Sequence, residues 1–400
     1  MQLAAALRLS KVPRLAVTGA GGKTSTLFWL ARELRQTYPT VILTTTTHLG
    51  AWQVQGGDAH QIVTDAQDFD LPPGVVVVTG PPRTERRYGG LAEAALERLL
   101  ERADRQQIPL LVEADGARLL PLKAPAEHEP AIPQFIDHVV VCAGLSGLGQ
   151  PLTAEWVHRA PQFARLAEMA PGELITPQAV SRVLMHPQGG LKNIPAAARR
   201  SLLLTQAASV ELQAQAHSIA RQVQPAYHGV IVAELSRLPS TQAEACSPVV
   251  PQPHIHAVHE AIAGVILAAG GATRFGSLKQ LVDWQGQPML RRVAQTALQA
   301  GLAPLVVVTG AGAAQVAQAV AGLPLQVVEN PQWQRGQSSS MQAGLNAIPP
   351  TCGGVVFLLA DQPNVPAALI QALVDAHSQA LAPIVAPLVD GQRGNPVLFD

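Results

Sequence analysis

Two basic side chains follow a run of small residues in the stretch VILAAGGATRFGSLKQL, residues 265–281. Small residues let the main chain approach a triphosphate without a Cβ clash. Arg274 can donate paired hydrogen bonds to the β- and γ-phosphates, and Lys279 can neutralise charge on the α-phosphate and the departing pyrophosphate. We therefore predict a nucleotide loop with Arg274 and Lys279 as catalytic residues, since a purely structural turn needs no cations at fixed offsets. The residues expected to cradle the nucleotide are Leu267, Ala268, Ala269, Gly270, Gly271 and Gly276.

Polar residues at other strand ends complete this candidate site. In FLLADQP, Asp361 follows an apolar run and is predicted to be a catalytic ligand of Mg²⁺. In ENPQWQRGQSSSMQAGL, Asn330, Ser339 and Ser340 are predicted to contact a ribose, a base edge or a pterin phosphate. The alternative for the serines is ordinary capping of a helix.

A second glycine-rich loop, VTGAGGKTST, begins at Val17. The usual P-loop G-x-x-x-x-G-K-[ST] would need glycine at position 17, and a dinucleotide fingerprint would need glycine at position 24. The shorter spacing resembles the loop of Mur-type ligases and predicts a compact phosphate-binding loop, the alternative being a glycine turn with an incidental lysine. Its phosphate-binding residues are predicted to be Gly19, Gly21, Gly22, Lys23, Thr24 and Ser25.

Acidic and hydroxyl side chains end two further apolar runs. VILTTTTH (residues 41–48) ends in four threonines and a histidine, and PLLVEADGAR (residues 109–118) carries Glu113 and Asp115 before a glycine. Together with Thr24, these two acids are predicted to hold Mg²⁺. Threonines of a half-buried strand and acids of a solvated strand end are the simpler alternatives.

Three other features are interpreted as structural. VVVTGAGAAQ (residues 306–315) imitates a dinucleotide fingerprint but has Gln315 at the third glycine position, so we expect a crossover turn. The histidines at 254, 256 and 259 lie in a Pro-rich stretch and are expected to be solvated. Trp333 is expected to pack in the core, although its position near the polar loop leaves a stacking role open.

Alternating apolar strands and helices must position these loops. The pattern predicts two doubly wound α/β domains with parallel sheets: a P-loop-like domain over residues 1–240 and a Rossmann-like nucleotidyltransferase domain over residues 262–400. Residues 241–261, rich in Pro, Ser and Gln, are predicted to be a linker. The strands expected in the first domain are 15–18, 41–45, 75–79, 110–114, 138–142, 201–205 and 230–233, and those in the second are 264–267, 305–309, 327–328, 355–359 and 384–386.

The composition restricts the classes of partner. Lys plus Arg and Asp plus Glu balance at 28 each, so no global charge attracts nucleic acid or anionic lipid. The 3 cysteines form no C-x-x-C pair, and no apolar run approaches the roughly 18 residues of a membrane span. We expect a cytoplasmic protein with small-molecule substrates, no nucleic acid partner and no membrane association.

The motifs of the first half together resemble a known family. VTGAGGKTS, TTTTH, VEADGARLLPLKAPAEHEPAIP, HVVVCAGLSGLG and HPQGGLKNIP resemble the YqeC-type proteins, which are assigned as accessory proteins of selenium-dependent hydroxylases, over residues 10–235. In that family a strand near position 205 ends in an N-K-x-D-like segment that reads guanine. This chain has LLLTQAAS (residues 202–209) there, so weak base discrimination is expected.

The motifs of the second half resemble the MobA-like nucleotidyltransferases over residues 262–400, and most closely the molybdenum cofactor cytidylyltransferases. The resemblance implies transfer of CMP from CTP to molybdopterin with Mg²⁺. L-A-A-G at residues 267–270 and D-Q-P at residues 361–363 favour CTP over GTP. Members continue past GNPVLF with a G-D-x-G-x-R segment, whereas this chain ends at Asp400, so the domain is expected to be incomplete.

The resulting hypothesis is a bifunctional molybdenum-cofactor maturation protein that serves an apo molybdenum hydroxylase. Three alternatives stay open: a guanylyltransferase, a nucleotidyltransferase for a sugar phosphate or methylerythritol phosphate, and a non-catalytic cofactor chaperone.

Overall fold

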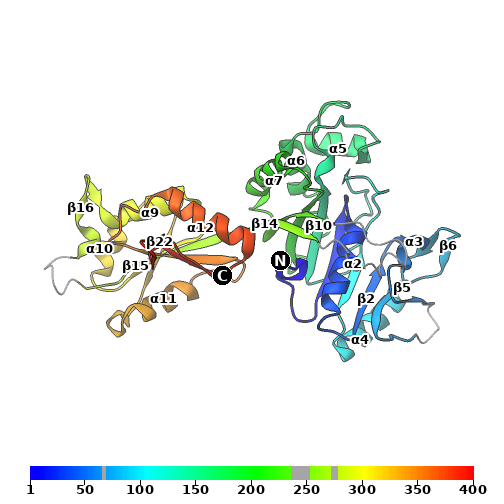
Figure 1. The fold of residues 1–400 in the computed structure, drawn as a ribbon, viewed down its shortest axis with the longest axis horizontal. Helices are drawn as coiled ribbons and strands as arrows, with labels where there is room; N and C mark the ends of the chain where they lie inside the picture. Colours follow the sequence, from blue (N-terminus) through cyan, green and yellow to red (C-terminus); the bar gives the residue numbers. More distant parts are fainter. Residues whose placement is uncertain (65–68, 236–252, 272–277) are drawn as a thin grey trace. The chain divides into compact units, whose positions relative to one another are not determined.

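The computed structural model describes residues 1–64, 69–235, 253–271 and 278–400. The chain forms two compact units, Met1–His259 and Glu260–Asp400 (Figure 1). Each unit has its own central sheet and its own apolar core. Among the described residues, no helix is long and apolar enough to cross a membrane.

A sheet of nine strands forms the centre of the first unit. From β13 to β4, every strand runs parallel to its neighbours, which confirms the predicted parallel sheet. In spatial order the strands are β14 (His254–Glu260), β13 (Gly229–Glu234), β12 (Arg199–Thr205), β10 (His138–Gly144), β1 (Arg14–Gly19), β8 (Leu110–Glu113), β2 (Thr40–Thr45), β5 (Gly74–Thr79) and β4 (Ala59–Ile62).

Helices cover both faces of this sheet because alternate strand side chains point to opposite faces. Ala16 of β1 belongs to the core formed with one group of helices, while Leu15 and Val17 are buried outside that core. Helix α2 contacts β1, β2 and β8, and α1 packs against α2. The helices of the first group are α4 (Glu93–Gln106), α5 (Ala160–Ala167), α6 (Pro177–Met185) and α7 (Val210–Val223), and the other two are α1 (Leu3–Ala6) and α2 (Lys23–Leu34).

Two small sheets extend the first unit. The antiparallel sheet β3-β7-β6 consists of β3 (His48–Gly50), β7 (Arg87–Gly89) and β6 (Pro82–Thr84), and α3 (Ala51–Val54) follows β3. Strand β9 (Leu122–Lys123) pairs in parallel with β11 (Val157–His158). The small strands surround the carboxyl ends of the central strands, where the predicted loops lie.

Strand β14 corrects the predicted linker over residues 241–261. Residues 254–260 form a strand at the edge of the first sheet, and residues 241–252 lie outside the described residues. His259 is not solvated as predicted, because its Nε2 lies 2.7 Å from His217 Nδ1 and burial lowers its pKa to about 4. Ile255 and Ala257 alternate along β14 and are buried, and the adjacent Val258 is buried as well.

The second unit is built on a sheet of six strands. Four run parallel, and β24 is antiparallel to both of its neighbours. Figure 1 shows α11 on one side of the sheet and α9 and α12 on the other, in agreement with the two cores of this unit. The strands in spatial order are β19 (Gln326–Glu329), β18 (Leu305–Thr309), β15 (Ile262–Ala268), β20 (Gly354–Leu359), β24 (Val397–Phe399) and β21 (Ile384–Val385); the helices are α9 (Met289–Gln299), α10 (Ala313–Ala319), α11 (Gln337–Asn346) and α12 (Ala367–Ala380).

Candidate functional site

The first glycine-rich loop joins β1 to α2. Gly19, Gly21 and Gly22 have φ angles of 91°, 78° and 120°. A Cβ on Gly21 would lie 2.4 Å from the backbone nitrogen of Gly144, so this position requires glycine. Helix α2 begins at Lys23, and no side chain caps its first turn. Its leading N–H groups therefore lie at the carboxyl edge of the sheet, where a helix amino terminus favours an anion.

The loop's own N–H groups are mostly engaged within the protein. The N–H of Gly19 donates to Asp115 Oδ2 (3.0 Å), and those of Ala20 and Gly21 donate to the carbonyls of Cys142 (2.9 Å) and Leu120 (3.0 Å). The loop is thus held rigidly against β10 and the acidic loop. A phosphate would be bound by the start of α2 and by Lys23 rather than by these three groups.

Lys23 is buried, with 5% of its surface exposed. Its Nζ donates to the carbonyl of Gly19 (2.9 Å) and lies 3.3 Å from Asp115 Oδ1 and 3.9 Å from Glu113 Oε1. Burial disfavours the charged ammonium, but the two carboxylates outweigh this and raise the pKa of Lys23. The lysine is therefore a fixed positive charge at the loop.

Thr24, Glu113 and Asp115 were predicted to hold Mg²⁺, and that role stays a prediction. Thr24 Oγ1 donates to Glu113 Oε2 (3.2 Å) and accepts from Gln53 Nε2 (2.5 Å). Burial raises the pKa of Glu113 although Lys23 opposes it. Asp115 Oδ1 is buried and accepts no hydrogen bond from the described residues, although Lys23 Nζ lies 3.3 Å from it. Ser25 lies half-buried on the first turn of α2.

This set of oxygens fits Mg²⁺ held jointly with phosphate. Mg²⁺ is commonly bound by one or two carboxylates together with substrate phosphates. Among the described residues, no group of three His, Cys, Asp or Glu side chains could hold a metal ion alone. Glu113, Asp115 and Thr24 would supply the protein's ligands, and a bound Mg²⁺ would neutralise phosphate charge.

Three residues that the sequence analysis missed extend this cluster. Lys123 Nζ donates to Asp115 Oδ2 (2.7 Å) and to Glu129 Oε2 (2.8 Å). Arg159 donates two hydrogen bonds to Glu129, from Nη1 to Oε2 (2.8 Å) and from Nη2 to Oε1 (3.0 Å). Burial disfavours the ionised Glu129, but Arg159 and Lys123 lower its pKa to about 2. Lys123 and Glu129 both lie in the segment VEADGARLLPLKAPAEHEPAIP, but the sequence analysis assigned neither of them a role, and Arg159 lies 30 residues after Glu129, outside that segment.

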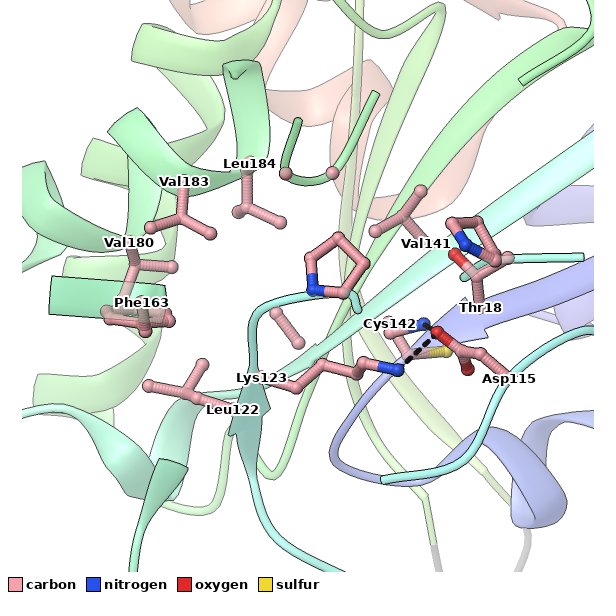
Figure 2. Close-up of a pocket in the computed structure, with 16 residues that line it drawn as sticks. Thr18, Asp115, Leu122, Lys123, Val141, Cys142, Phe163, Val180, Val183 and Leu184 are labelled. Carbon is pink, nitrogen blue, oxygen red and sulfur yellow. Dashed lines mark hydrogen bonds and ion pairs between the residues drawn. The ribbon is translucent and has the colours of Figure 1, made fainter. Parts of the chain in front are cut away.

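A small cavity, with about 40 Å³ of space for water-sized molecules, opens beside the ion pairs. Figure 2 shows Asp115 and Lys123 meeting at one end, next to Cys142, with Phe163, Val180, Val183 and Leu184 on the far wall. Burial raises the pKa of the Cys142 thiol to about 12. The thiol is therefore neutral, and the charged side chains that line the cavity, Asp115 and Lys123, lie at the end beside the β1–α2 loop.

The second glycine-rich loop follows β15, the third strand of its sheet. Ala268 and Ala269 are buried, while Gly270 is exposed with open space where a Cβ would lie. Arg274 and Gly276 lie outside the described residues. Lys279 is exposed, and the next residue, Gln280, is buried and donates through Nε2 to the carbonyls of Ala268 (3.0 Å) and Gly270 (3.3 Å). Gln280, which the sequence analysis missed, fixes the shape of the loop.

Asp361 lies at the same edge as this loop. It follows β20, which pairs in parallel with β15, and Leu359 is in register with Leu267. The carboxyl ends of parallel neighbours meet at one edge of a sheet. Asp361 is exposed and no ion pair to it is found in the described part of the chain. An exposed carboxylate beside a nucleotide loop fits a Mg²⁺ ligand.

Asn330, Ser339 and Ser340 also come together, but with one another. Asn330 Nδ2 donates to the hydroxyls of Ser339 (2.8 Å) and Ser340 (3.0 Å), and its Oδ1 accepts from the N–H of Gln332 (2.9 Å). The amide is therefore occupied in positioning the start of α11. Their predicted contact with substrate stays a prediction.

Trp333 packs close to the second glycine loop. A Cβ on Gly271 would lie 2.9 Å from the Trp333 ring, and a Cβ on Gly310 would lie 2.7 Å from Trp333. The turn after β18 also reaches the loop, since the N–H of Ala311 donates to the carbonyl of Ala269 (3.2 Å). The segment interpreted as a crossover turn thus supports the loop that follows β15.

Known proteins resemble the two units separately. The family described as YqeC protein matches residues 15–161, and the family described as MobA-like NTP transferase domain matches residues 264–400. The uncharacterized protein YqeC of Escherichia coli is 36% identical over 194 residues, which are 46% of this chain and 73% of that protein. The chain belongs to the YqeC family. Its second unit is a MobA-like NTP transferase domain, so the predicted fusion is confirmed.

A curated protein and a solved structure are similar to the second unit. Nicotine blue oxidoreductase of Paenarthrobacter nicotinovorans is 32% identical over 146 residues, 35% of this chain and 71% of that protein. The crystal structure of Rv0371c from Mycobacterium tuberculosis is 29% identical, covers 35% of this chain and 70% of its own, and has a TM-score of 0.32.

Proposed function

We propose that the second unit of this YqeC-family protein transfers CMP from CTP to the terminal phosphate of molybdopterin and releases pyrophosphate. The observation that carries the proposal is the L-A-A-G loop at residues 267–270, in a MobA-like domain, at the same sheet edge as Asp361. Arg274 and Lys279 supply the cations, and Asp361 holds Mg²⁺. The proposed place of action is the cytoplasm, and the proposed recipient is an apo molybdenum hydroxylase.

The proposed chemistry requires positioning more than proton transfer. The attacking molybdopterin phosphate is already an anion, so no general base is needed. Lys279 neutralises charge that develops on the α-phosphate and the leaving pyrophosphate. Gln280 acts through the loop, because its two hydrogen bonds fix the carbonyls of Ala268 and Gly270. Bound Mg²⁺ would neutralise the triphosphate further.

One assay separates this proposal from its rivals. Pyrophosphate release is measured with the full chain, Mg²⁺ and CTP, GTP or ATP at equal concentration, and the acceptor is molybdopterin, a sugar phosphate or methylerythritol phosphate in separate runs. Preferred release from CTP supports cytidylyl transfer, and preferred release from GTP replaces it with guanylyl transfer. Release only with a sugar phosphate or methylerythritol phosphate indicates another nucleotidyltransferase. Tight binding of molybdopterin without release indicates a cofactor chaperone.

We propose that the first unit binds a nucleoside triphosphate with Mg²⁺ at Lys23 and the start of α2, where the loop of residues 19–22 ends. Support comes from the buried Lys23, the uncapped start of α2, and the adjacent Glu113 and Asp115. The proposed base discrimination is weak, because Gln206 at the end of β12 is occupied by a hydrogen bond from Ser146 (2.6 Å). Calorimetric titration with ATP and GTP tests this: Kd values within about tenfold are expected, and strict GTP selectivity would contradict it.

A further inference from the structure

The small sheet β3-β7-β6 lies at the edge of the first unit that carries the phosphate loop. Strand β3 follows the carboxyl end of β2, and β6 and β7 follow the carboxyl end of β5. Two side-chain contacts tie this region to the site. Gln53 of α3 donates to Thr24 (2.5 Å), and Thr46 Oγ1 donates to the carbonyl of Ala131 (2.8 Å). The small sheet is therefore positioned against the phosphate loop.

One face of the small sheet carries two arginines and a histidine. His48 pairs with Gly89 and Gly50 with Arg87, and side chains directly opposite in an antiparallel pair share a face. Arg83 joins them, since a Cβ on Gly89 would lie 3.1 Å from Arg83 Nε. His48, Arg83 and Arg87 thus form one cluster. The opposite face is occupied by buried Leu49 and by Tyr88, whose ring packs on His60.

This cluster faces the acidic loop. A Cβ on Gly116, the residue after Asp115, would lie 3.3 Å from His48 Cε1. Burial, followed by Arg87 and Arg83, lowers the pKa of His48, which keeps the imidazole neutral at neutral pH. Both arginines are exposed, and no carboxylate pairs with either among the described residues. Glu85 in the intervening turn does not pair with them either. Exposed guanidinium groups without an acid partner are suited to bind phosphate.

We propose that Arg83 and Arg87 bind the terminal phosphate of a nucleoside triphosphate whose inner phosphates lie at Lys23 and the start of α2. The inference rests on the proposed nucleotide binding by the first unit. The loop side of the site supplies Lys23, whose charge is already shared with Asp115 and Glu113. The small sheet supplies two further positive charges, which no acid balances in the part of the chain that the structure describes. His48 lies beside the arginines as a neutral donor.

Calorimetric titration of the full chain with Mg²⁺ and either ATP or ADP tests the proposal. Binding at the first unit is defined as the part lost in Lys23→Ala. Arg83→Ala and Arg87→Ala are expected to raise the Kd for ATP at least tenfold and to change the Kd for ADP less than twofold. Arg87→Lys is expected to restore part of the loss. Arg105→Ala is the control, because this exposed arginine lies in the last turn of α4, which leads to the amino end of β8.

The outcomes separate the two proposals. An unchanged Kd for ATP in both arginine variants, or equal weakening of ATP and ADP, overturns the role of the arginines and leaves nucleotide binding intact. Absence of any Lys23-dependent binding in the unsubstituted chain overturns nucleotide binding and the arginine role together. Thermal unfolding of each variant shows that its fold is retained, and the ADP titration reports on the loop itself.

Discussion

At the scale of residues, the first unit concentrates alternating buried charges at one strand edge. Lys23, Asp115, Lys123, Glu129 and Arg159 form a continuous series of ion pairs. Asp115 forms ion pairs with both Lys23 and Lys123. A phosphate that approaches Lys23 would therefore compete with the Asp115 carboxylate for the ammonium group. Nucleotide binding would exchange partners within this series rather than fill an empty positive pocket.

The ionised state of Glu129 gives a prediction about acid stability. Its pKa of about 2 lies below the ordinary value of 4.5, so its stabilising contribution is present above pH 4.5 and is lost as pH falls toward 2. Glu129→Gln leaves Lys123 and Arg159 without their shared carboxylate and is expected to lower the free energy of unfolding at pH 7 by about 3 kcal/mol. Urea unfolding of both proteins between pH 7 and pH 3 measures this difference in the free energy of unfolding.

The difference between wild type and Glu129→Gln should shrink as the pH falls below 4.5. Glu127→Gln is the matched control, because Glu127 is exposed two residues away and its side chain makes no ion pair among the described residues. If the difference in the free energy of unfolding did not change with pH, Glu129 would stabilise the fold through packing rather than through its charge.

Lys279 gives the residue-scale prediction for the second unit. It is exposed beside the buried Gln280, so Lys279→Ala should leave the fold intact. A fixed charge beside developing negative charge contributes several kcal/mol to such a step, and CMP transfer is expected to fall by roughly 10²-fold. Pyrophosphate release measures it, and Arg292→Ala on exposed α9 surface is the control. Turnover of Lys279→Ala within threefold of wild type would remove the residue from the active site.

At the scale of elements, the sequence predicted the long buried strands well and the short exposed ones poorly. Runs such as Val75–Thr79 are continuous and apolar, which is typical of a parallel sheet buried on both faces, and β5 spans Gly74–Thr79. Strands β6 and β7 have three residues each, and every residue of β6 is exposed, so the two strands carry no periodic signal. Strand β14 was missed because its polar residues continue the composition of the preceding Pro-rich segment.

The candidate site residues also differ in how well the sequence predicted them, according to whether they follow a long strand. Lys23, Thr24, Glu113 and Asp115 follow predicted strands directly, and topology brings those strand ends together. Lys123, Glu129 and Arg159 meet only through tertiary packing of β9 and the residues around it. Contacts of this kind leave no spacing in one sequence. Glu113, Asp115 and their partner Lys23 could be predicted because they follow strands, whereas Glu129 and its partners Lys123 and Arg159 could not.

Loop geometry supplies the element-scale prediction. Gly21 and Gly172 have similar φ angles, 78° and 83°, but a Cβ would lie 2.4 Å from Gly144 N at Gly21 and would meet nothing within 4 Å at Gly172. Gly172→Ala is expected to cost about 1 kcal/mol of stability from its backbone conformation alone. Gly21→Ala adds a backbone clash and is expected to cost more and to abolish nucleotide binding. Equal stability losses in urea unfolding would contradict the clash.

At the scale of the whole molecule, both units use the same device. Each places a glycine loop after a central parallel strand and an acidic residue after the neighbouring strand: Asp115 after β8 beside β1, and Asp361 after β20 beside β15. Carboxyl ends of parallel strands gather such loops at one edge. The likeness is one of architecture, since the two units belong to different families.

The separate sheets and cores predict that the two sites work independently. Lys23→Ala should abolish nucleotide binding at the first unit and leave CMP transfer within twofold of wild type. Conversely, Lys279→Ala should leave the Kd of Lys23-dependent ATP binding within twofold of wild type, because each substitution lies in a unit with its own core.

A second experiment measures coupling between the two sites directly. Such coupling is reciprocal, so a ligand at one site would alter the affinity of the other site for its ligand by the same factor. Titrating CTP into the full chain with and without saturating ATP, in wild type and in Lys23→Ala, measures that factor. If ATP changes the affinity for CTP more than fivefold, and Lys23→Ala removes that change, then nucleotide binding at the first unit alters CTP binding at the second.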